Sequence, residues 1–135
     1  MKYLTGEEIL VIHDEIINET GGLHGVRDIG LFLSLIERPN TSFGGTEVHA
    51  TVFEKAAAYF ESVAMYHVFL DGNKRTSVVA AARFLFLNGF DLMASNIDTE
   101  RFTLKVVEDK LPISAIAAWL KKNTRKSSQK SVRKA

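Results

Sequence analysis

The chain has 135 residues, the length of one domain, and no cysteine, which excludes a disulfide framework and a thiolate metal site. It lacks both a signal-peptide stretch and an apolar run long enough for a membrane span, so we expect a cytoplasmic protein. Residues 1–120 carry 10 Lys and Arg against 16 Asp and Glu, whereas residues 121–135 carry 7 basic and no acidic residues. The acidic body argues against specific binding of nucleic acid.

The first predicted helix begins after Thr5. Thr5 and Glu8 have the spacing of a capping box, and the Gly21-Gly22 pair ends the helix. His13 lies beside the apolar stripe at helical spacing, so we interpret it as a core histidine rather than a metal ligand. The stripe consists of Ile9, Ile12, Ile16 and Ile17.

Two further helices are predicted before the middle of the chain. Asp28 is placed to cap one of them, and residues 38–47, with two glycines and a proline, look irregular. Thr51 and Glu54 form a second capping box, which opens a helix that delivers His67 at its C-terminal end.

The segment from residue 78 to 90 is apolar almost all round, which is typical of a helix buried at the centre of a bundle. On this interpretation Val79→Asp would bury a charge and unfold the domain. Residues 90–97 are predicted to form a hairpin or a loop. Asp98 is expected to cap the next helix, and residues 113–120 make the last one.

These patterns predict an all-α fold, a compact bundle of about six helices around a central buried helix at residues 76–88. We expect the helical domain to span residues 1–123. Residues 124–135, rich in Lys, Arg and Ser, are expected to be a disordered basic tail.

A cluster of chemically active side chains lies at the start of that central segment, in the nine residues from His67 to Arg75. The first turn of a helix presents unpaired N–H groups and the positive end of the helix dipole. Lys74 and Arg75 in such a turn oppose the dipole unless an anion compensates them. Each residue alone could be structural, but together with Asn73 they predict a phosphate site.

The same cluster contains the groups that phosphoryl transfer requires. His67 is the side chain suited to take a proton from a hydroxyl at neutral pH. Asp71 offers an oxygen ligand for Mg²⁺, and Gly72 leaves room for the backbone to approach a phosphate. The sequence therefore predicts a site that acts on a phosphorylated ligand.

The motif H-V-F-L-D-G-N-K-R closely resembles that of the Fic/Doc proteins, H-x-F-x-[D/E]-G-N-[G/K]-R, and Lys74 is similar to the Doc, or death-on-curing, branch. The similarity covers roughly residues 3–95. It implies an all-α toxin that phosphorylates a threonine of translation elongation factor Tu with ATP and so arrests protein synthesis. A separate antitoxin with a disordered segment would restrain it.

The resemblance also implies a role for each residue of the motif. His67 would deprotonate the target hydroxyl, Asp71 would hold Mg²⁺, and Asn73, Lys74 and Arg75 would bind the phosphates of ATP. In Fic enzymes proper a glycine replaces this lysine and AMP is transferred; a lysine would obstruct that placement of the nucleotide, which favours phosphate transfer.

Two alternatives to the kinase stay open at this point. One is a Fic-like AMP transferase that modifies a protein hydroxyl. The other is a non-catalytic protein that binds a nucleotide or a partner. It is suggested by Met65, where family members often carry an arginine, and by Leu33, where an acidic residue is common.

Overall fold

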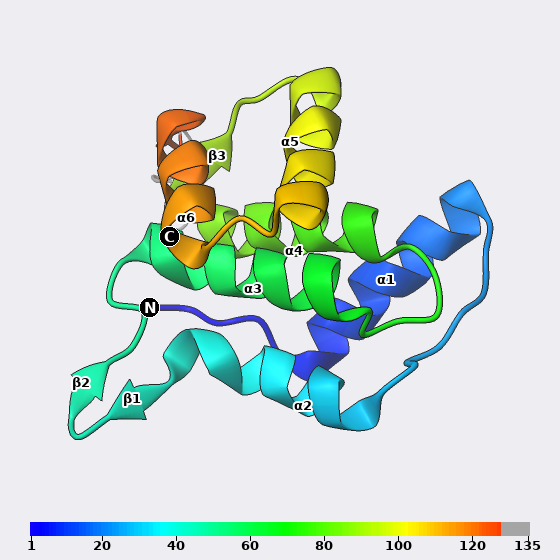
Figure 1. Ribbon diagram of the computed structural model, residues 1–135, viewed down its shortest axis with the longest axis horizontal. Helices are drawn as coiled ribbons and strands as arrows, with labels where there is room; N and C mark the ends of the chain where they lie inside the picture. The colour runs from blue at the N-terminus through cyan, green and yellow to red at the C-terminus, as the bar shows by residue number, and fades with distance from the viewer. Residues whose placement is uncertain (128–135) are drawn as a thin grey trace, which may run out of the picture.

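A computed structural model describes residues 1–127 of the chain, which form six α-helices, one 3₁₀ turn and four short strands (Figure 1). This confirms the predicted all-α bundle. None of the helices in this part of the chain is long and apolar enough to cross a bilayer. The helices are α1 (Gly6–Thr20), α2 (Ile29–Glu37), α3 (Val52–Tyr66), α4 (Asn73–Leu87), α5 (Asn96–Asp109) and α6 (Ile113–Lys122).

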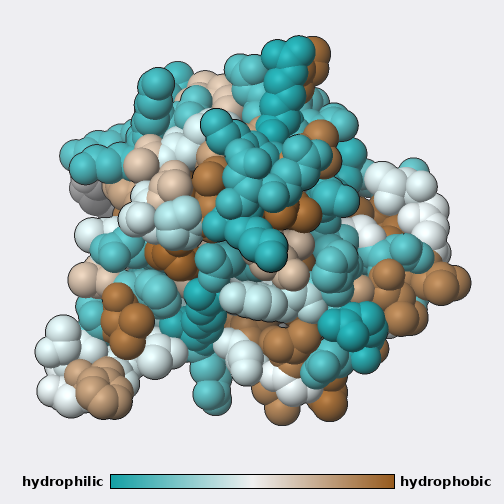
Figure 2. All heavy atoms as spheres, viewed as in Figure 1, coloured by the Kyte–Doolittle hydropathy of each residue, from teal (hydrophilic) through white to brown (hydrophobic). Residues whose placement is uncertain are grey.

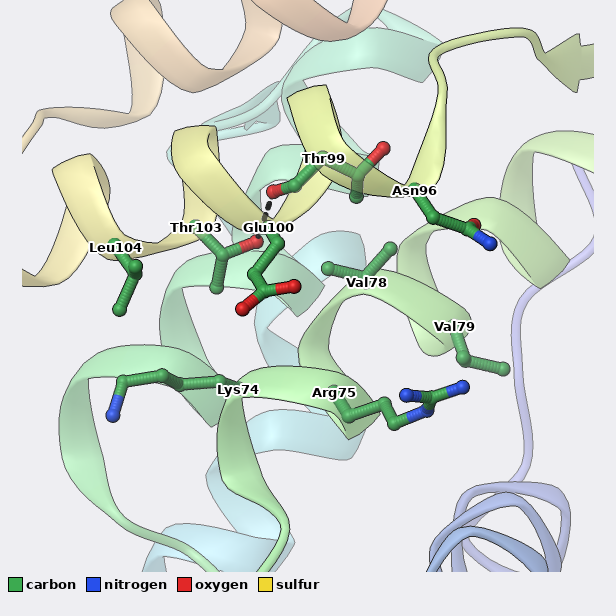
Figure 3. A pocket seen from close by; sticks show the side chains of 9 residues that line it. All are labelled: Lys74, Arg75, Val78, Val79, Asn96, Thr99, Glu100, Thr103 and Leu104. Carbon is green, nitrogen blue, oxygen red and sulfur yellow. Dashed lines mark hydrogen bonds between the residues drawn. The ribbon is translucent and has the colours of Figure 1, made fainter. Parts of the chain in front are cut away.

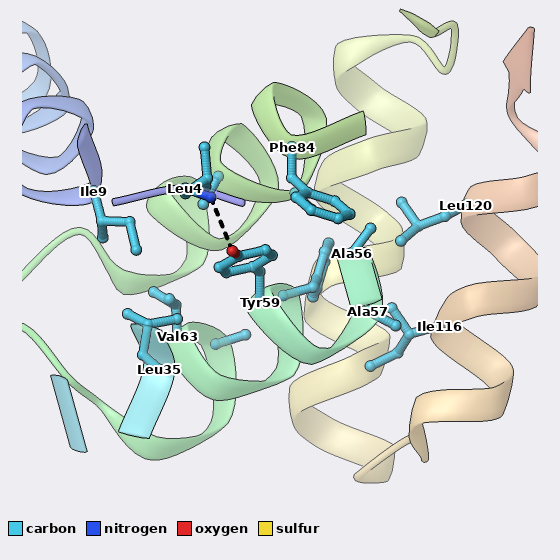
Figure 4. Packing of buried hydrophobic residues seen from close by; sticks show 14 of the residues in the cluster. Leu4, Ile9, Leu35, Ala56, Ala57, Tyr59, Val63, Phe84, Ile116 and Leu120 are labelled. Atoms are coloured by element: carbon cyan, nitrogen blue, oxygen red, sulfur yellow. Dashed lines mark hydrogen bonds between the residues drawn. The ribbon is translucent and has the colours of Figure 1, made fainter. Parts of the chain in front are cut away.

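Helices α3 and α4 run side by side through the centre, and α1, α2, α5 and α6 pack around them (Figure 1). Three consecutive alanines, residues 56–58, are fully buried on α3 and let the neighbouring helices approach closely. The Tyr59 hydroxyl accepts a hydrogen bond from the backbone N–H of Leu4 at 3.0 Å, which ties the N-terminal segment to the core (Figure 4). Burial raises the pKa of Tyr59 to about 12.

The centre of the bundle is shared between two helices rather than held by residues 76–88 alone. Nine of the fifteen residues of α3 are buried. Helix α4 buries one side but leaves Val79 38% exposed, because α5 does not cover its first two turns completely. The expectation that Val79→Asp would bury a charge was therefore wrong.

The helix starts largely follow the local sequence signals. Both capping boxes are present, since Glu8 N–H donates to Thr5 Oγ1 and Glu54 N–H donates to Thr51 Oγ1, each at 3.1 Å. Asp28 caps α2 as expected. Asp98 does not cap α5, whose N-cap is Ser95, three residues earlier.

The strands lie where the sequence suggested loops or no order. Within residues 38–47, a 3₁₀ turn (Arg38–Asn40) leads to a hairpin of β1 (Ser42–Phe43) and β2 (Thr46–Glu47). Strand β3 (Phe90–Leu92) pairs antiparallel with β4 (Thr124–Lys126) rather than with a local partner. Order thus extends past residue 123, and the remainder of the expected tail, from residue 128, lies outside the described residues.

The surface differs between the two sides of the bundle. Figure 2 shows mostly hydrophilic side chains over α5, and hydrophobic side chains gathered over α2 and the segment that precedes it. Exposed apolar residues in that second region are Leu23, Ile29 and Leu33. The α2 side therefore offers apolar surface at the same end of the bundle as the loop between α3 and α4.

Candidate active site

The motif forms the connection between the two central helices. Residues 67–72 leave the end of α3, cross to the start of α4 and pair with the segment before α2 (Figure 1). Arg27 N–H donates to Val68 O at 2.8 Å, and Leu70 N–H donates to Gly25 O at 3.1 Å. These backbone contacts fix the path of the loop on one side.

His67 ends α3 in a left-handed conformation, with φ 51° and ψ 56°, and its side chain is exposed. The Arg27 guanidinium closes the helix, because Nε donates to His67 O at 2.6 Å and Nη2 donates to Tyr66 O at 3.0 Å. The imidazole makes no hydrogen bond to any other residue in 1–127, so it is free to meet a substrate. Sequence reasoning missed this role of Arg27, which no local spacing signals.

Phe69 anchors the middle of the loop in the core. Its ring is fully buried and stacks on His13, with ring centroids 3.9 Å apart and planes at 9°. His13 Nε2 donates to Asp71 O at 2.8 Å. The prediction that His13 is a satisfied core histidine is confirmed, and the structure adds that its partner is the motif itself.

Asn73 is the residue whose role differs most from the expectation. Its side chain is buried, its Oδ1 accepts from Phe69 N–H at 3.0 Å, and its Nδ2 donates to Phe69 O at 2.9 Å. Both polar atoms of the amide are thus used to shape the loop. The part of Asn73 that remains for an anion is its backbone N–H in the first turn of α4.

Asp71 is held by the segment after α1. Leu23 N–H donates to Asp71 Oδ2 at 2.7 Å, and a Cβ on Gly22 would approach the Asp71 side chain to 3.1 Å. Oδ1 accepts no hydrogen bond from the described residues. Among those residues there is no cluster of three metal-ligating groups, so a bound Mg²⁺ would take Asp71 together with phosphate and water oxygens, as Mg²⁺ commonly does.

Gly72 is required for packing and for backbone conformation. It is the N-cap of α4 with φ 75°, a conformation that favours glycine, and a Cβ there would lie 2.9 Å from Ile17 Cδ1. The space that its missing side chain leaves is filled by α1. The reason for glycine is therefore different from the expected close approach to a phosphate.

The N-terminus of α4 is left open and positively charged. Gly72 provides no side-chain cap, and the first turn contains no acidic residue. Lys74 and Arg75 are exposed, form no ion pair with residues 1–127, and line a pocket of about 410 Å³ between α4 and α5 (Figure 3). Such a helix end favours an anion from solution.

The two positions that depart from the motif's usual surroundings have different environments. Met65 is half-buried and packs against the core, on the helix end that Arg27 caps. Leu33 is 56% exposed on α2. Neither side chain takes part in the hydrogen bonds that shape the loop, so the loop's geometry does not depend on them.

Known proteins match the whole region that builds this site. The model of the Fic/DOC family matches residues 3–85. Toxin Doc of Mycolicibacterium smegmatis is 37% identical over 100 residues, which are 74% of this chain and 74% of that protein. Protein kinase doc of Escherichia phage P1 is 30% identical over 122 residues, 90% of this chain and 95% of that protein. The chain therefore belongs to the Fic/Doc family, and within it to the Doc branch.

Proposed function

We propose that the chain is a Doc-like toxin, a kinase that transfers the γ-phosphate of ATP to a threonine hydroxyl of translation elongation factor Tu. The observation that carries the proposal is the junction of α3 and α4, where an exposed, unpaired imidazole lies next to an uncapped helix N-terminus with two free cations. The names of the two relatives, a toxin and a protein kinase, support the same function.

In this mechanism His67 takes the proton from the threonine hydroxyl as its oxygen attacks the γ-phosphorus. A new O–P bond forms, the bond from the γ-phosphorus to the β,γ-bridging oxygen breaks, and ADP leaves with the bonding electrons. The backbone N–H groups of the first turn of α4, together with Lys74 and Arg75, stabilise the charge on the phosphates. Mg²⁺ at Asp71 would supply further charge neutralisation when bound.

A protein acceptor suits the surroundings of the imidazole. His67 lies at the surface rather than in a deep cleft, and its sequence neighbours Tyr66 and Leu70 are 48% and 47% exposed. Such apolar side chains favour contact with another protein over contact with a small solute. By the same proposal, an antitoxin with a disordered segment would restrain the enzyme in the cell.

The test uses ATP labelled at either end of the phosphate chain, with purified elongation factor Tu as acceptor. The proposal expects the γ label to appear on a threonine of the factor and the α label to remain in solution. Loss of transfer in His67→Ala, with transfer retained in His49→Ala, would support the assigned base. His49 lies before the opposite end of α3, about 22 Å away at 1.5 Å per residue.

Transfer of AMP is the second candidate, and one observation favours it. Lys74 is exposed and unpaired among the described residues, so its side chain could turn aside and admit the α-phosphate at the helix N-terminus. In that case the α label would reach the acceptor protein and the γ label would leave as pyrophosphate. If neither label is transferred and growth arrest persists in His67→Ala, the chain acts by binding alone.

A further inference from the structure

The pocket between α4 and α5 lies directly beside the proposed phosphate site. Its volume of about 410 Å³ is within the range of small-molecule pockets, roughly 300–1,000 Å³. The side chains that line it come from two helices and are drawn in Figure 3. They are Lys74, Arg75, Val78 and Val79 of α4 and Asn96, Thr99, Glu100, Thr103 and Leu104 of α5.

The α4 wall changes from cationic to apolar over one helical turn. Val78 follows Lys74 by four residues and Val79 follows Arg75 by four, so each pair shares a side of the helix. A ligand that places its charge at the first turn would therefore meet apolar surface about 5 Å further along α4. Leu104 adds apolar surface from the opposite wall.

The α5 wall contributes one charged side chain, Glu100. The hydroxyl of Thr99 donates to Ser95 O and that of Thr103 donates to Thr99 O, each at 2.8 Å, so both donors are already used within α5. Glu100 reaches from α5 toward α4 and forms no ion pair with Lys74 or with another residue in 1–127 (Figure 3). Its carboxylate can only accept hydrogen bonds and repels phosphate.

We propose that this pocket binds the nucleoside part of the nucleotide whose phosphates lie at the N-terminus of α4. The base would lie against Val78, Val79 and Leu104, and the ribose hydroxyls would donate to the Glu100 carboxylate. A nucleotide fits the pocket because it is anionic at one end and carries neutral hydroxyl donors beyond it. This assignment rests on the proposed use of ATP by the same site.

Binding measurements on the full-length protein test the assignment without relying on phosphate transfer. Isothermal titration would compare ATP, 2′,3′-dideoxy-ATP and inorganic tripolyphosphate in the presence of Mg²⁺. The wild type should bind ATP more tightly than either of the other two. Glu100→Ala should weaken ATP about tenfold, leave dideoxy-ATP nearly unchanged, and leave tripolyphosphate unchanged or slightly tighter.

A matched variant on the same helix controls for general electrostatics. Glu108 is an exposed acid of α5 that does not line the pocket, so Glu108→Ala should leave all three affinities unchanged. An equal loss of ATP and dideoxy-ATP binding in Glu100→Ala, or no loss of either, would overturn the role of the carboxylate.

Filling the pocket provides a second test that removes no polar group. Val79→Trp should reduce ATP binding to the level of tripolyphosphate, whereas Val11→Trp, at an exposed position on α1, should not. Thermal unfolding would verify that both variants fold. If Val79→Trp binds ATP as tightly as the wild type, the nucleoside lies elsewhere. The proposed kinase function fails separately, if the wild type transfers no γ label.

Discussion

The N-termini of α3 and α4 are the two ends of the central helices that carry lysines, and they are built in opposite ways. At α3, Thr51 caps the helix and Glu54 places a negative charge in the first turn. The following Lys55 is buried, and its Nζ donates to Pro39 O and to Glu47 Oε1, each at 3.0 Å. At α4 the cap is a glycine, the first turn has no acid, and Lys74 is exposed.

The difference shows how one kind of helix end can serve structure or chemistry. The positive end of α3 is neutralised by the chain itself, so it has no need of a ligand. The positive end of α4 is reinforced by Lys74 and Arg75 and is compensated by nothing in residues 1–127. Such an arrangement weakens the isolated helix slightly and prepares the site for an anion from solution.

The largest effect is expected at the imidazole beside the open end. His67→Asn removes the base but keeps a residue that tolerates the left-handed conformation. Transfer of the γ label should fall by about 10²–10⁴-fold. The free energy of unfolding, measured in urea, should change by less than about 0.5 kcal/mol because the side chain is exposed. A variant that unfolds instead would assign His67 a structural role.

The next largest effect should come from Asn73→Ala, which removes the clamp that orients the open end. The backbone N–H and C=O of Phe69 would lose their partners in the core, at a cost of about 1–3 kcal/mol for each group left unpaired. Urea unfolding measures this loss, and Asn18→Ala on the exposed face of α1 is the matched control. Equal stability of the two variants would show that the clamp is dispensable.

Lys74→Glu makes the α4 end resemble the α3 end, and it should move stability and binding in opposite directions. An acid in the first turn should raise the free energy of unfolding by about 0.3–1 kcal/mol. ATP affinity should fall about tenfold or more, because a charge-assisted phosphate contact is lost. Unfolding and titration curves on one preparation would measure both. A variant that loses stability would contradict the claim that this cation opposes the helix dipole.

Thr51→Ala opens the α3 end instead. Loss of the Thr51 Oγ1 bond to Glu54 N–H should cost about 1 kcal/mol of stability, and Thr51→Ser should restore most of it. ATP affinity should not change in either variant, since this helix end carries buried, paired charge and no ligand. A loss of ATP binding comparable to that of Lys74→Glu would erase the distinction between the two ends.

The sequence predicted those features of the two ends that depend on neighbouring residues. Both capping boxes, the helix end at His67 and the placement of two cations in the first turn of α4 follow from spacing within a few positions. The all-α bundle follows in the same way from helical periodicity. Such local signals are reliable because one turn of helix decides them.

The features that the sequence did not predict depend on partners far along the chain. Arg27 caps a helix end 39 and 40 residues away, and His13 donates to a carbonyl 58 residues away. The pairing of β3 with β4 joins segments of three residues each, too short for an alternating pattern. No spacing rule indicates which loop will fold against which helix, so these contacts emerge only from the tertiary structure.

Val79→Asp is the substitution for which sequence and structure disagree most, and it is expected to have the smallest effect. Its neighbours in sequence are apolar, but Val79 lies on the open side of α4 that begins with Lys74 and Arg75, where a carboxylate stays hydrated. The free energy of unfolding should change by less than about 0.5 kcal/mol. Ala81→Asp, two residues later and fully buried, should destabilise the domain by several kcal/mol, because a buried carboxylate has no partner. Equal losses in urea unfolding would mean that α5 covers this side of α4 and that the open end stops at its first turn.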